Sequence, residues 1–315
     1  MKAIRFHQYG DADVLQLDDV EIPDPGAGQV RVRVAGTTFN SVDGNIRAGF
    51  MQDPMPLALP HVPGLDVAGT VDALGDGVTG LRVGDEVVGF LPFVVDGASA
   101  DYVVAPAESL AQAPTTIPLA DAAALPLVGL TAWQALFEHA GLQAGQRILV
   151  NGAGGAVGGY AVQLAKAAGA HVIATGSPRS CEQLAARGAD EVIDHTSNDV
   201  ASTVTEPVDV LLNLAPIEPE QLEALAGRVA DGGVVVNATV WMPAPSDDAR
   251  GVRGVDLYVR SDAQQLAGLV ARVDRGELVV DVAERVALAD LPAVHARAAA
   301  GTLAGKVVVV PTESV

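Results

Sequence analysis

A run of glycine and alanine between an apolar segment and an amphipathic one constrains this chain more than any other feature. In RILVNGAGGAVGGYAVQLAKAAGAHVIAT, residues 147–175, Gly152, Gly155 and Gly158 stand three apart between a predicted strand and a predicted helix. A helix N-terminus offers a phosphate positive potential and uncovered N–H groups, and side chains in the turn before it would block the approach. The stretch therefore predicts a phosphate site at the start of a helix.

The strand–turn–helix–strand context matches the Rossmann fingerprint of dinucleotide-binding proteins, with Ala153 where the fingerprint has its first glycine. Gly155 would let the backbone approach a pyrophosphate, and Gly158 would let the helix pack on the sheet, so neither is expected to leave space for a side chain. A P-loop would need Gly-Lys-Ser/Thr at the start of the helix, and that is missing. The predicted phosphate turn comprises Gly152, Ala153, Gly154, Gly155, Ala156, Val157 and Gly158.

The end of the second strand selects the cofactor. An NAD site usually has Asp or Glu ~20 residues after the glycine turn, where it accepts from the ribose 2′-hydroxyl. This chain has Thr175, Gly176, Ser177 and Arg179 there, with no acid until Glu182. A carboxylate would repel a 2′-phosphate, whereas serine and arginine can donate to it, so the sequence predicts NADPH. A lone arginine beside a loop is also often merely solvated.

Alternation of strands and helices predicts the domain around this turn. From residue 123 to residue 260, apolar strands alternate with helical or loop segments, which indicates a doubly wound parallel sheet covered on both faces. A helix over residues 118–142, ending near His139 and Gly141, is expected to precede the first strand. The expected strands are 147–152, 171–175, 191–195, 208–214 and 232–239.

The N-terminal part of the chain predicts a second kind of domain. Its β-rich runs are separated by Gly, Pro and Asp, the pattern of a small barrel, and the tail at 282–311 predicts a strand, a helix and a strand that return to it. The fold class is therefore α/β, with a β-barrel domain of residues 1–122 and 261–315 and a Rossmann domain of residues 123–260. The expected barrel strands include 30–39, 64–74, 84–91 and 100–106.

Composition and the chain start limit the possible partners. The 315 residues carry 39 Asp and Glu against 19 Lys and Arg, a formal charge of −20, so the surface would repel nucleic-acid phosphates. The start MKAIRFHQYG is too polar for a secretory signal, and the longest apolar run, AAALPLVGLTAWQALF, is shorter than the ~20 residues of a membrane span. A single cysteine, Cys181, excludes an internal disulfide. A cytoplasmic protein with neither nucleic-acid nor membrane partners is expected.

Several blocks, in order along the chain, resemble the medium-chain dehydrogenase/reductase superfamily and, within it, the zinc-independent quinone oxidoreductase (zeta-crystallin-like) group. The blocks include FNSVDGNIRAG, PHVPGLDVAGTV, LPLVGLTAWQAL and GAGGAVGGYAVQLAKAAGA. The resemblance implies a GroES-like β-barrel domain built from both chain ends and a Rossmann domain between them.

Metal ligands of the zinc-dependent relatives are missing from the matching positions. Those relatives hold a catalytic zinc with a cysteine and a histidine where this chain has Asn40 and Leu65, and the four cysteines of their structural zinc are absent. His61, Asp66 and Asp43 could be imagined as metal ligands. Because a third soft ligand is missing, a structural role is expected for them instead. No metal is expected.

The absence of zinc ligands narrows the predicted chemistry. Hydride addition to a plain ketone creates a basic alkoxide that zinc normally stabilises, whereas addition to an enone or a quinone gives a delocalised oxyanion that one or two hydrogen-bond donors can stabilise. The sequence therefore predicts NADPH-dependent reduction of quinones or α,β-unsaturated carbonyls. The alternatives are an enoyl-thioester reductase acting on CoA-linked or carrier-linked chains, and an NADPH-binding protein with little turnover.

The resemblance also implies roles for individual residues. Asn40 matches an asparagine that faces the nicotinamide and donates to substrate or cofactor, and Thr131 matches a threonine near the nicotinamide ribose; a turn or helix-cap role is the alternative for each. Asn45 stands where quinone reductases of the group often have a tyrosine, so that proton donor is missing. His195 stands where a tyrosine often lies near the 2′-phosphate; it either assists Arg179 or simply ends a strand.

Loops after the later strands should border the ligands, because ligands bind beyond the carboxyl ends of such strands. Arg260 is expected to reach a phosphate or to form a surface ion pair, and Trp241 and Met242 to line the substrate pocket or the core. Residues 252–260 form a plausible edge strand for a homodimer. The cofactor-bordering loop residues are expected to be Leu214, Ala215, Ala238 and Thr239.

Overall fold

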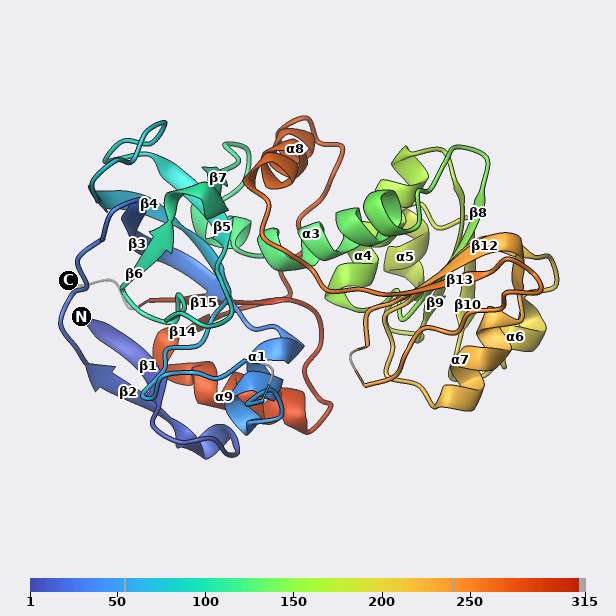
Figure 1. Ribbon diagram of the computed structural model, residues 1–315, viewed down its shortest axis with the longest axis horizontal. Coiled ribbons are helices and arrows are strands. Elements are labelled where there is room, and N and C mark those ends of the chain that lie inside the picture. The colour runs from blue at the N-terminus through green and yellow to red at the C-terminus, as the bar shows by residue number, and fades with distance from the viewer. Residues whose placement is uncertain (54, 240, 312–315) are drawn as a thin grey trace. The chain divides into compact units, whose positions relative to one another are not determined.

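Six parallel strands form one sheet in the stretch that the sequence assigns to a Rossmann domain (Figure 1). Their order is β10-β9-β8-β11-β12-β13, so the chain starts near the middle of the sheet, winds to one edge and then returns to build the other half. This is the order of the doubly wound dinucleotide-binding fold. The strands are β8 (Arg147–Asn151), β9 (His171–Gly176), β10 (Glu191–Asp194), β11 (Val208–Asn213), β12 (Val229–Asn237) and β13 (Arg253–Asp256).

The computed structural model describes residues 1–53, 55–239 and 241–311. It divides into two compact units: the first unit is made of Met1–Leu127 and Ser261–Val315, and the second unit, Val128–Arg260, holds the parallel sheet. The boundaries thus lie at 127/128 and 260/261, where the sequence predicted 122/123 and 260/261. β13 lies at one edge of the sheet, as expected, and the homodimer that this edge suggested stays a prediction.

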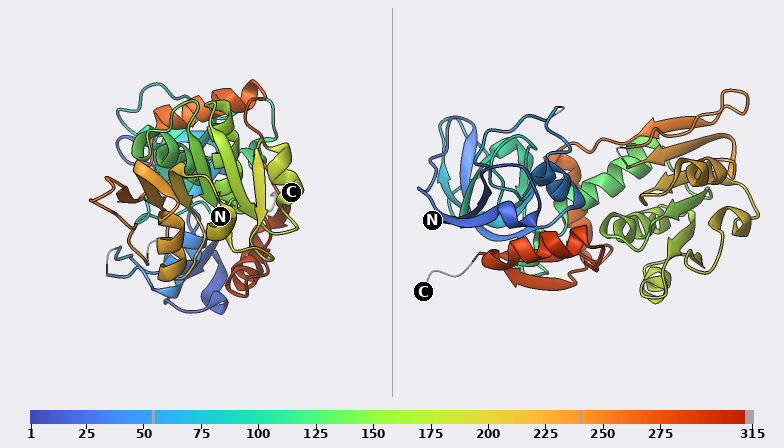
Figure 2. Two further views of the ribbon diagram at one scale, coloured as in Figure 1. Left: turned by 90° about the vertical axis from the view of Figure 1, so that its right-hand side faces the viewer. Right: turned by 90° about the horizontal axis from the view of Figure 1, so that it is seen from below.

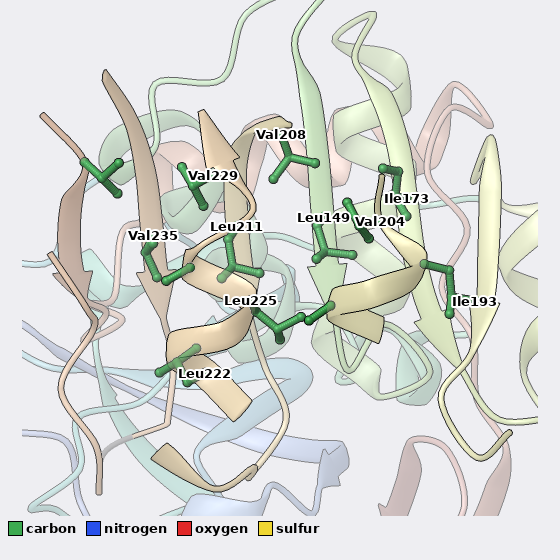
Figure 3. Packing of buried hydrophobic residues seen from close by; sticks show 13 residues of the cluster. Leu149, Ile173, Ile193, Val204, Val208, Leu211, Leu222, Leu225, Val229 and Val235 are labelled. Carbon is green, nitrogen blue, oxygen red and sulfur yellow. The ribbon is translucent and has the colours of Figure 1, made fainter. Parts of the chain in front are cut away.

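Leucines on one face of the parallel sheet pack against helix α7 (Figure 3). Leu149 and Leu211 project from neighbouring strands toward Leu222 and Leu225 of this helix, and each of the four is at most 4% exposed. Full burial of a leucine side chain contributes about 1.5–3 kcal/mol, so this layer is a main source of the unit's stability. Helix α4 packs on strands β8 and β9, and helix α5 packs on strands β9 and β10. The helices of this unit are α4 (Ala156–Ala167), α5 (Cys181–Ala186), α6 (Val200–Thr203) and α7 (Pro219–Ala226).

The other unit is built mainly on antiparallel strands. Its larger sheet has the order β14-β15-β3-β4-β5-β7, with β6 paired to β3, and β1 and β2 form a separate hairpin. The expected strands at 30–39, 64–74, 84–91 and 100–106 are all present; β1, β2 and β7 were not predicted. The strands are β1 (Lys2–Phe6), β2 (Leu15–Asp19), β3 (Gln29–Thr38), β4 (Asp66–Leu74), β5 (Glu86–Phe90), β6 (Tyr102–Pro106), β7 (Leu110–Gln112), β14 (Glu284–Ala287) and β15 (Val307–Val310).

Residue alternation explains which face of β3 lies inward. Val30, Val32 and Val34 are buried in one apolar cluster, while Arg31 and Arg33 between them are not buried. Because successive side chains of a strand point to opposite faces, this pattern places the valines in the core of the unit and the arginines outside it.

The C-terminal tail returns to the first unit, as predicted. β15 pairs antiparallel with the end of β3, where Val308 and Val309 lie opposite Thr38 and Thr37. The blue N-terminal strands and the red α9 lie together in Figures 1 and 2. The helices of this unit are α1 (Ser41–Ala48), α2 (Leu119–Ala122), α8 (Ala263–Asp274) and α9 (Leu291–Ala299).

The helix expected over residues 118–142 is interrupted, and this explains the shifted boundary. It consists of α2, α3 (Pro126–Trp133) and a π-helical turn, Gln134–His139. Proline lacks an N–H group and disfavours helical geometry in the residue before it, so α2 ends ahead of Pro126. α2 packs on β3 and β4 and therefore belongs to the first unit.

One helical segment of the described residues, Leu119–His139, is long and apolar enough to cross a membrane, with 83% of its most apolar window buried inside the protein. Core helices pass the same test of length and hydropathy. In this fold, that apolar surface is used for internal packing.

Candidate functional site

The turn between β8 and α4 contains glycine at two positions where a side chain does not fit. Gly152 has a φ of 82°, in the left-handed region, and a Cβ there would lie 2.9 Å from the backbone nitrogen of Ala215. A Cβ on Gly158 would lie 2.4 Å from the Cα and the carbonyl oxygen of Ala153. The first turn of α4 therefore rests on the backbone of the glycine turn, as predicted for Gly158.

Gly155, the N-cap residue of α4, is different. It is exposed, and the nearest atom to a Cβ there would be the carbonyl oxygen of Gly152 at 3.5 Å, an ordinary contact. The expectation that the fold leaves no space at Gly155 is therefore wrong, because only a bound ligand would exclude a side chain. Among the described residues no side chain caps α4, so the N–H groups of Ala156 and Val157 at its start suit an anion.

The end of β9 packs tightly against this turn. A Cβ on Gly154 would lie 2.6 Å from the hydroxyl oxygen of Ser180, and one on Gly176 would lie 2.7 Å from the same oxygen. That hydroxyl accepts from the backbone N–H of Ser177 at 3.1 Å. The structure thus brings the predicted 2′-phosphate segment beside the predicted pyrophosphate turn.

Thr175 supports the turn from within. It is 1% exposed, and its hydroxyl oxygen accepts from the N–H of Gly152 at 2.8 Å while its own proton is donated to Asn151. Of the predicted loop residues, Leu214 donates its N–H to the carbonyl oxygen of Asn151 and so follows the sheet toward the same turn. In the same way, Ala238, directly after β12, donates its N–H to the carbonyl oxygen of Asn213.

Two side chains with donor capacity flank the end of β9. Arg179 is exposed in the turn that follows, and its guanidinium has neither an ion pair nor a hydrogen bond within the described part of the chain. His195 is also exposed, and its backbone N–H donates to the carbonyl oxygen of Gly176 at 3.0 Å. The carboxylate of Asp194 is occupied by the hydroxyl and N–H of Thr196, which hold its pKa below the usual value.

A cavity of about 230 Å³ lies at the carboxyl ends of β12 and β13. Trp241 is 66% exposed and therefore is not a core residue, whereas Met242 lines the cavity and also packs on the core. The structure thus brings Thr239, predicted to border the cofactor, together with Trp241 and Met242, predicted to line the substrate pocket. The lining residues are Asn237, Thr239, Trp241, Met242, Pro243, Asp256, Leu257 and Tyr258.

Three other predicted site residues lie in neither the glycine turn nor the lining of this cavity. Thr131 is buried in α3, and Asn45 is half-buried in α1. Arg260 forms the surface ion pair that was one of its two expected roles, with Glu138 at 2.6 Å, and its backbone N–H donates to Gln134.

Asn40, the N-cap residue of α1, is held on both sides of its amide in the interior of the first unit. Its Nδ2 donates to a carboxylate oxygen of Asp66 at 2.8 Å, and its Oδ1 accepts from the ammonium group of Lys306 at 2.6 Å. All three side chains are buried. The structure thus places Asn40 in the helix-cap position that was the alternative role, and it also orients the amide; the donor role toward substrate or cofactor stays a prediction.

Asp66 has several hydrogen-bond partners in this cluster besides Asn40. It accepts from the hydroxyl of Thr38 and from the backbone N–H of Leu127 at 2.7 Å, and it lies 3.4 Å from the Lys306 ammonium. The bond to Leu127 satisfies an N–H group at the start of α3. Lys306 was not among the residues predicted from the sequence. Its position directly before the apolar strand β15 was the one signal, because a charge that is buried with such a strand requires a buried partner.

Burial shifts the pKa values of Asp43 and Lys306 in this region. Burial raises the pKa of Asp43 to about 7, and the like charge of Asp66 adds to the rise, while the N–H groups of Asn40 and Gly64 oppose it. Burial also lowers the pKa of Lys306, against the attraction of the two carboxylates.

The donor set around Asn40 does not fit zinc. Leu65 is buried and has no donor atom, and Asn40 and Asp66 are committed to each other and to Lys306. His61 is packed against the ring of Phe6. Within residues 1–53, 55–239 and 241–311, no three His, Cys, Asp or Glu side chains are grouped as metal ligands.

Comparison with known proteins identifies relatives over the whole chain. Residues 26–115 match the family model of the alcohol dehydrogenase GroES-like domain, and residues 187–309 match that of zinc-binding dehydrogenases. The chain is 32% identical over 326 residues to the chloroplast envelope quinone oxidoreductase homolog of Arabidopsis thaliana, covering 99% of this chain and 98% of that protein. It is 35% identical over 288 residues to the 2-methylene-furan-3-one reductase of Solanum lycopersicum, covering 88% and 70%. The structure of the quinone oxidoreductase from Coxiella burnetii matches with a TM-score of 0.89 at 28% identity, over 98% of each chain.

A GroES-like domain joined to a doubly wound domain with an open glycine turn defines a nicotinamide-dependent oxidoreductase. The chain belongs to the quinone oxidoreductase group of the medium-chain dehydrogenase/reductase superfamily. The fold class and the resemblance predicted from the sequence are confirmed.

Substitution of Gly155 tests the phosphate turn. Gly155→Val is expected to weaken NADPH binding by at least about 10-fold, because the side chain fits the fold but covers the N–H groups that would hold the pyrophosphate. Isothermal titration measures the affinity. The control is Gly159→Ala, one turn further along α4, where a Cβ would meet no atom of the described residues within 4 Å apart from its chain neighbours and the backbone of its own helix. Equal NADPH affinities in the two variants would show that the pyrophosphate lies elsewhere.

Substitution of Asp43 tests the buried carboxyl. Between pH 3.8 and about 7 the folded protein retains a proton at Asp43 that the unfolded chain has released, so the free energy of unfolding falls as the pH rises through this window. The contribution is at most about 1.4 kcal/mol per pH unit. Asp43→Asn removes it, and urea unfolding at a series of pH values should show a flatter dependence in the variant. Parallel dependences in both proteins would mean that Asp43 titrates normally.

Proposed function

We propose that this oxidoreductase transfers a hydride from NADPH to quinones or to the C=C bond of α,β-unsaturated carbonyl compounds, without a zinc ion. The observation that carries the choice of NADPH is the end of β9. Ser177, Arg179 and His195 lie there with donor capacity, and the neighbouring acid, Asp194, is bonded to Thr196. A 2′-phosphate would find hydrogen-bond donors at this position, whereas a ribose 2′-hydroxyl would lack its usual carboxylate.

Zinc-free chemistry is supported by the donor set around Asn40. The Lys306 ammonium group and the Asn40 amide both donate to the carboxylate of Asp66, so this carboxylate is already paired within the protein. An enolate or a phenolate-like oxyanion spreads its charge over several atoms and needs only one or two donors. Reduction of such substrates is therefore compatible with the residues present.

The residues have separable tasks in this proposal. When bound, the reduced nicotinamide supplies the hydride. The glycine turn and the start of α4 hold the diphosphate, and Ser177 and Arg179 hold the 2′-phosphate. Asn40, whose amide is fixed by Asp66 and Lys306, keeps a second N–H to donate to a substrate or cofactor oxygen. Such fixed donors lower the barrier because they need no reorganisation during the reaction.

The cavity beside β12 favours neutral, flat substrates. Trp241 and Tyr258 present largely exposed aromatic surface there, and Met242 adds apolar surface. Asp256 is the one charged residue of its lining among the described residues. A carboxylate repels the phosphates of CoA, so quinones and enones are preferred to CoA thioesters. A relative whose name describes reduction of a methylene-furanone supports the enone class.

Substitution of Arg179 tests the cofactor. Arg179→Ala is expected to raise the KM for NADPH by about 10-fold or more, because a charge-assisted hydrogen bond contributes roughly 1.5–3 kcal/mol. The KM for NADH should stay nearly unchanged. Arg253→Ala, which removes the same charge from the distant strand β13, is the matched control. Equal increases for both cofactors would remove Arg179 from the 2′-phosphate site.

A substrate panel tests the reaction. NADPH oxidation should be faster with 1,4-benzoquinone, methyl vinyl ketone or 2-hexenal than with crotonyl-CoA, and dialysis against a zinc chelator should leave the rate unchanged. Preference for crotonyl-CoA would favour the enoyl-thioester reductase. Tight NADPH binding without oxidation of any of the four would favour a binding protein with little turnover. Stoichiometric zinc that is lost together with activity would refute the zinc-free proposal.

A further inference from the structure

Three asparagines occupy equivalent positions at the carboxyl ends of neighbouring strands. Asn151 ends β8, Asn213 ends β11 and Asn237 ends β12, and the sheet register aligns Asn213 with both of the others. They are between 0% and 5% exposed. Asn151 and Asn213 stand on either side of the point where the strand order reverses, which is where doubly wound sheets bind their ligands.

The three side chains form a continuous chain of hydrogen bonds, called here the asparagine ladder. Asn151 Nδ2 donates to Asn213 Oδ1 at 2.8 Å, and Asn213 Nδ2 donates to Asn237 Oδ1 at 2.9 Å. Asn151 and Asn213 thus donate in the same direction across the sheet, toward Asn237. Asn213 also donates to the carbonyl oxygen of Ala215, which holds the loop after β11.

Both ends of the ladder reach segments of the candidate site. At one end, Asn151 Oδ1 accepts from Thr175, whose hydroxyl accepts in turn from the N–H of Gly152 in the glycine turn. At the other end, Asn237 Nδ2 donates to the carbonyl oxygens of Thr239 and Met242, at 3.0 and 2.6 Å. The ladder therefore connects the phosphate turn to the loop that lines the cavity.

Stability alone does not account for such a chain. Burying amides costs free energy unless their hydrogen bonds are made, and apolar residues of similar size would fill the same space without that requirement. A chain of amides in one direction is satisfied in one arrangement only, because each Oδ1 and Nδ2 must meet its particular partner. The distinctive effect of this chain of hydrogen bonds is to fix the positions of the segments that it joins.

We propose that the asparagine ladder is a positioning device that sets Thr239 and Met242, in the loop after β12 that also carries Trp241, relative to the glycine turn. Through it, Asn213 acts on substrate binding although it does not line the cavity. The inference rests on the proposed function for the identity of the ligands. Its effect on the loop is independent of them and can be measured on the protein alone.

Trp241 reports on the loop directly. The chain has two tryptophans, so in a Trp133→Phe background the emission comes from Trp241 alone. Asn213→Leu replaces the central amide with an apolar side chain of similar size, and Asn213→Ser serves if that variant does not fold. The control is Leu212→Val, on the same strand and also buried, which perturbs the core and leaves the ladder intact.

The Asn213 variants are expected to change acrylamide quenching of Trp241 and to raise the KM for 1,4-benzoquinone by about fivefold, the effect of one lost hydrogen bond. Their affinity for adenosine 2′,5′-bisphosphate, a probe of the segment after β9, should stay unchanged. The Leu212→Val control should match the parent protein in all three measurements. Unchanged quenching in a folded Asn213 variant, or a parallel loss of affinity for every ligand, would overturn the proposal.

The outcomes separate this inference from the proposed function. If the parent protein neither binds NADPH nor reduces the quinone, the proposed function fails, and the quenching comparison still decides whether Asn213 positions the loop. If the parent protein is active and the quenching of the Asn213 variants matches the control, the ladder proposal fails while the function stands.

Discussion

Close contact between α4 and the turn before it is the constraint on which the candidate site depends. A Cβ on Gly158 would lie 2.4 Å from Ala153, so the helix can start this near the sheet only with glycine at that position. The contact holds the start of α4 against the turn that follows β8, and no side chain of the described residues caps the first N–H groups of this helix. Gly155 then leaves those groups uncovered, although the fold itself would accept a side chain there. Packing thus requires glycine at position 158, whereas at position 155 it is the predicted phosphate binding that favours glycine.

Each unit also contains a buried polar group of side chains whose hydrogen bonds are mutually consistent. In the first unit Asp66 joins Asn40, Lys306 and the start of α3, and in the second the asparagine ladder crosses the parallel sheet. Buried charges and amides are costly unless paired, so both arrangements restrict the surrounding segments to one geometry. Asn40 and the loop after β12, the two places predicted to meet substrate, are each held by one of these groups.

Much of the site followed from local patterns. The glycine spacing, the absence of an acid in the segment from Thr175 to Arg179 and the position of Trp241 are properties of short stretches, and the structure places these segments at the carboxyl ends of the strands. The sequence predicted Thr175 only as part of the cofactor-binding segment, and the structure adds that its hydroxyl supports Gly152 from within. The helix over 118–142 was also predicted too long, since α2 packs with the first unit and Pro126 interrupts the segment.

The sequence by itself determined the class of fold, and it predicted the dinucleotide turn and a site without zinc ligands, because periodicity, glycine spacing and donor chemistry are readable within a few consecutive residues. Only the tertiary structure decided which distant polar residues meet. Lys306 reaches Asn40 across most of the chain, and Asn151, Asn213 and Asn237 align only through the register of the parallel strands. Such contacts depend on strand order and register, which are set by the packing of the whole sheet and are absent from any local pattern.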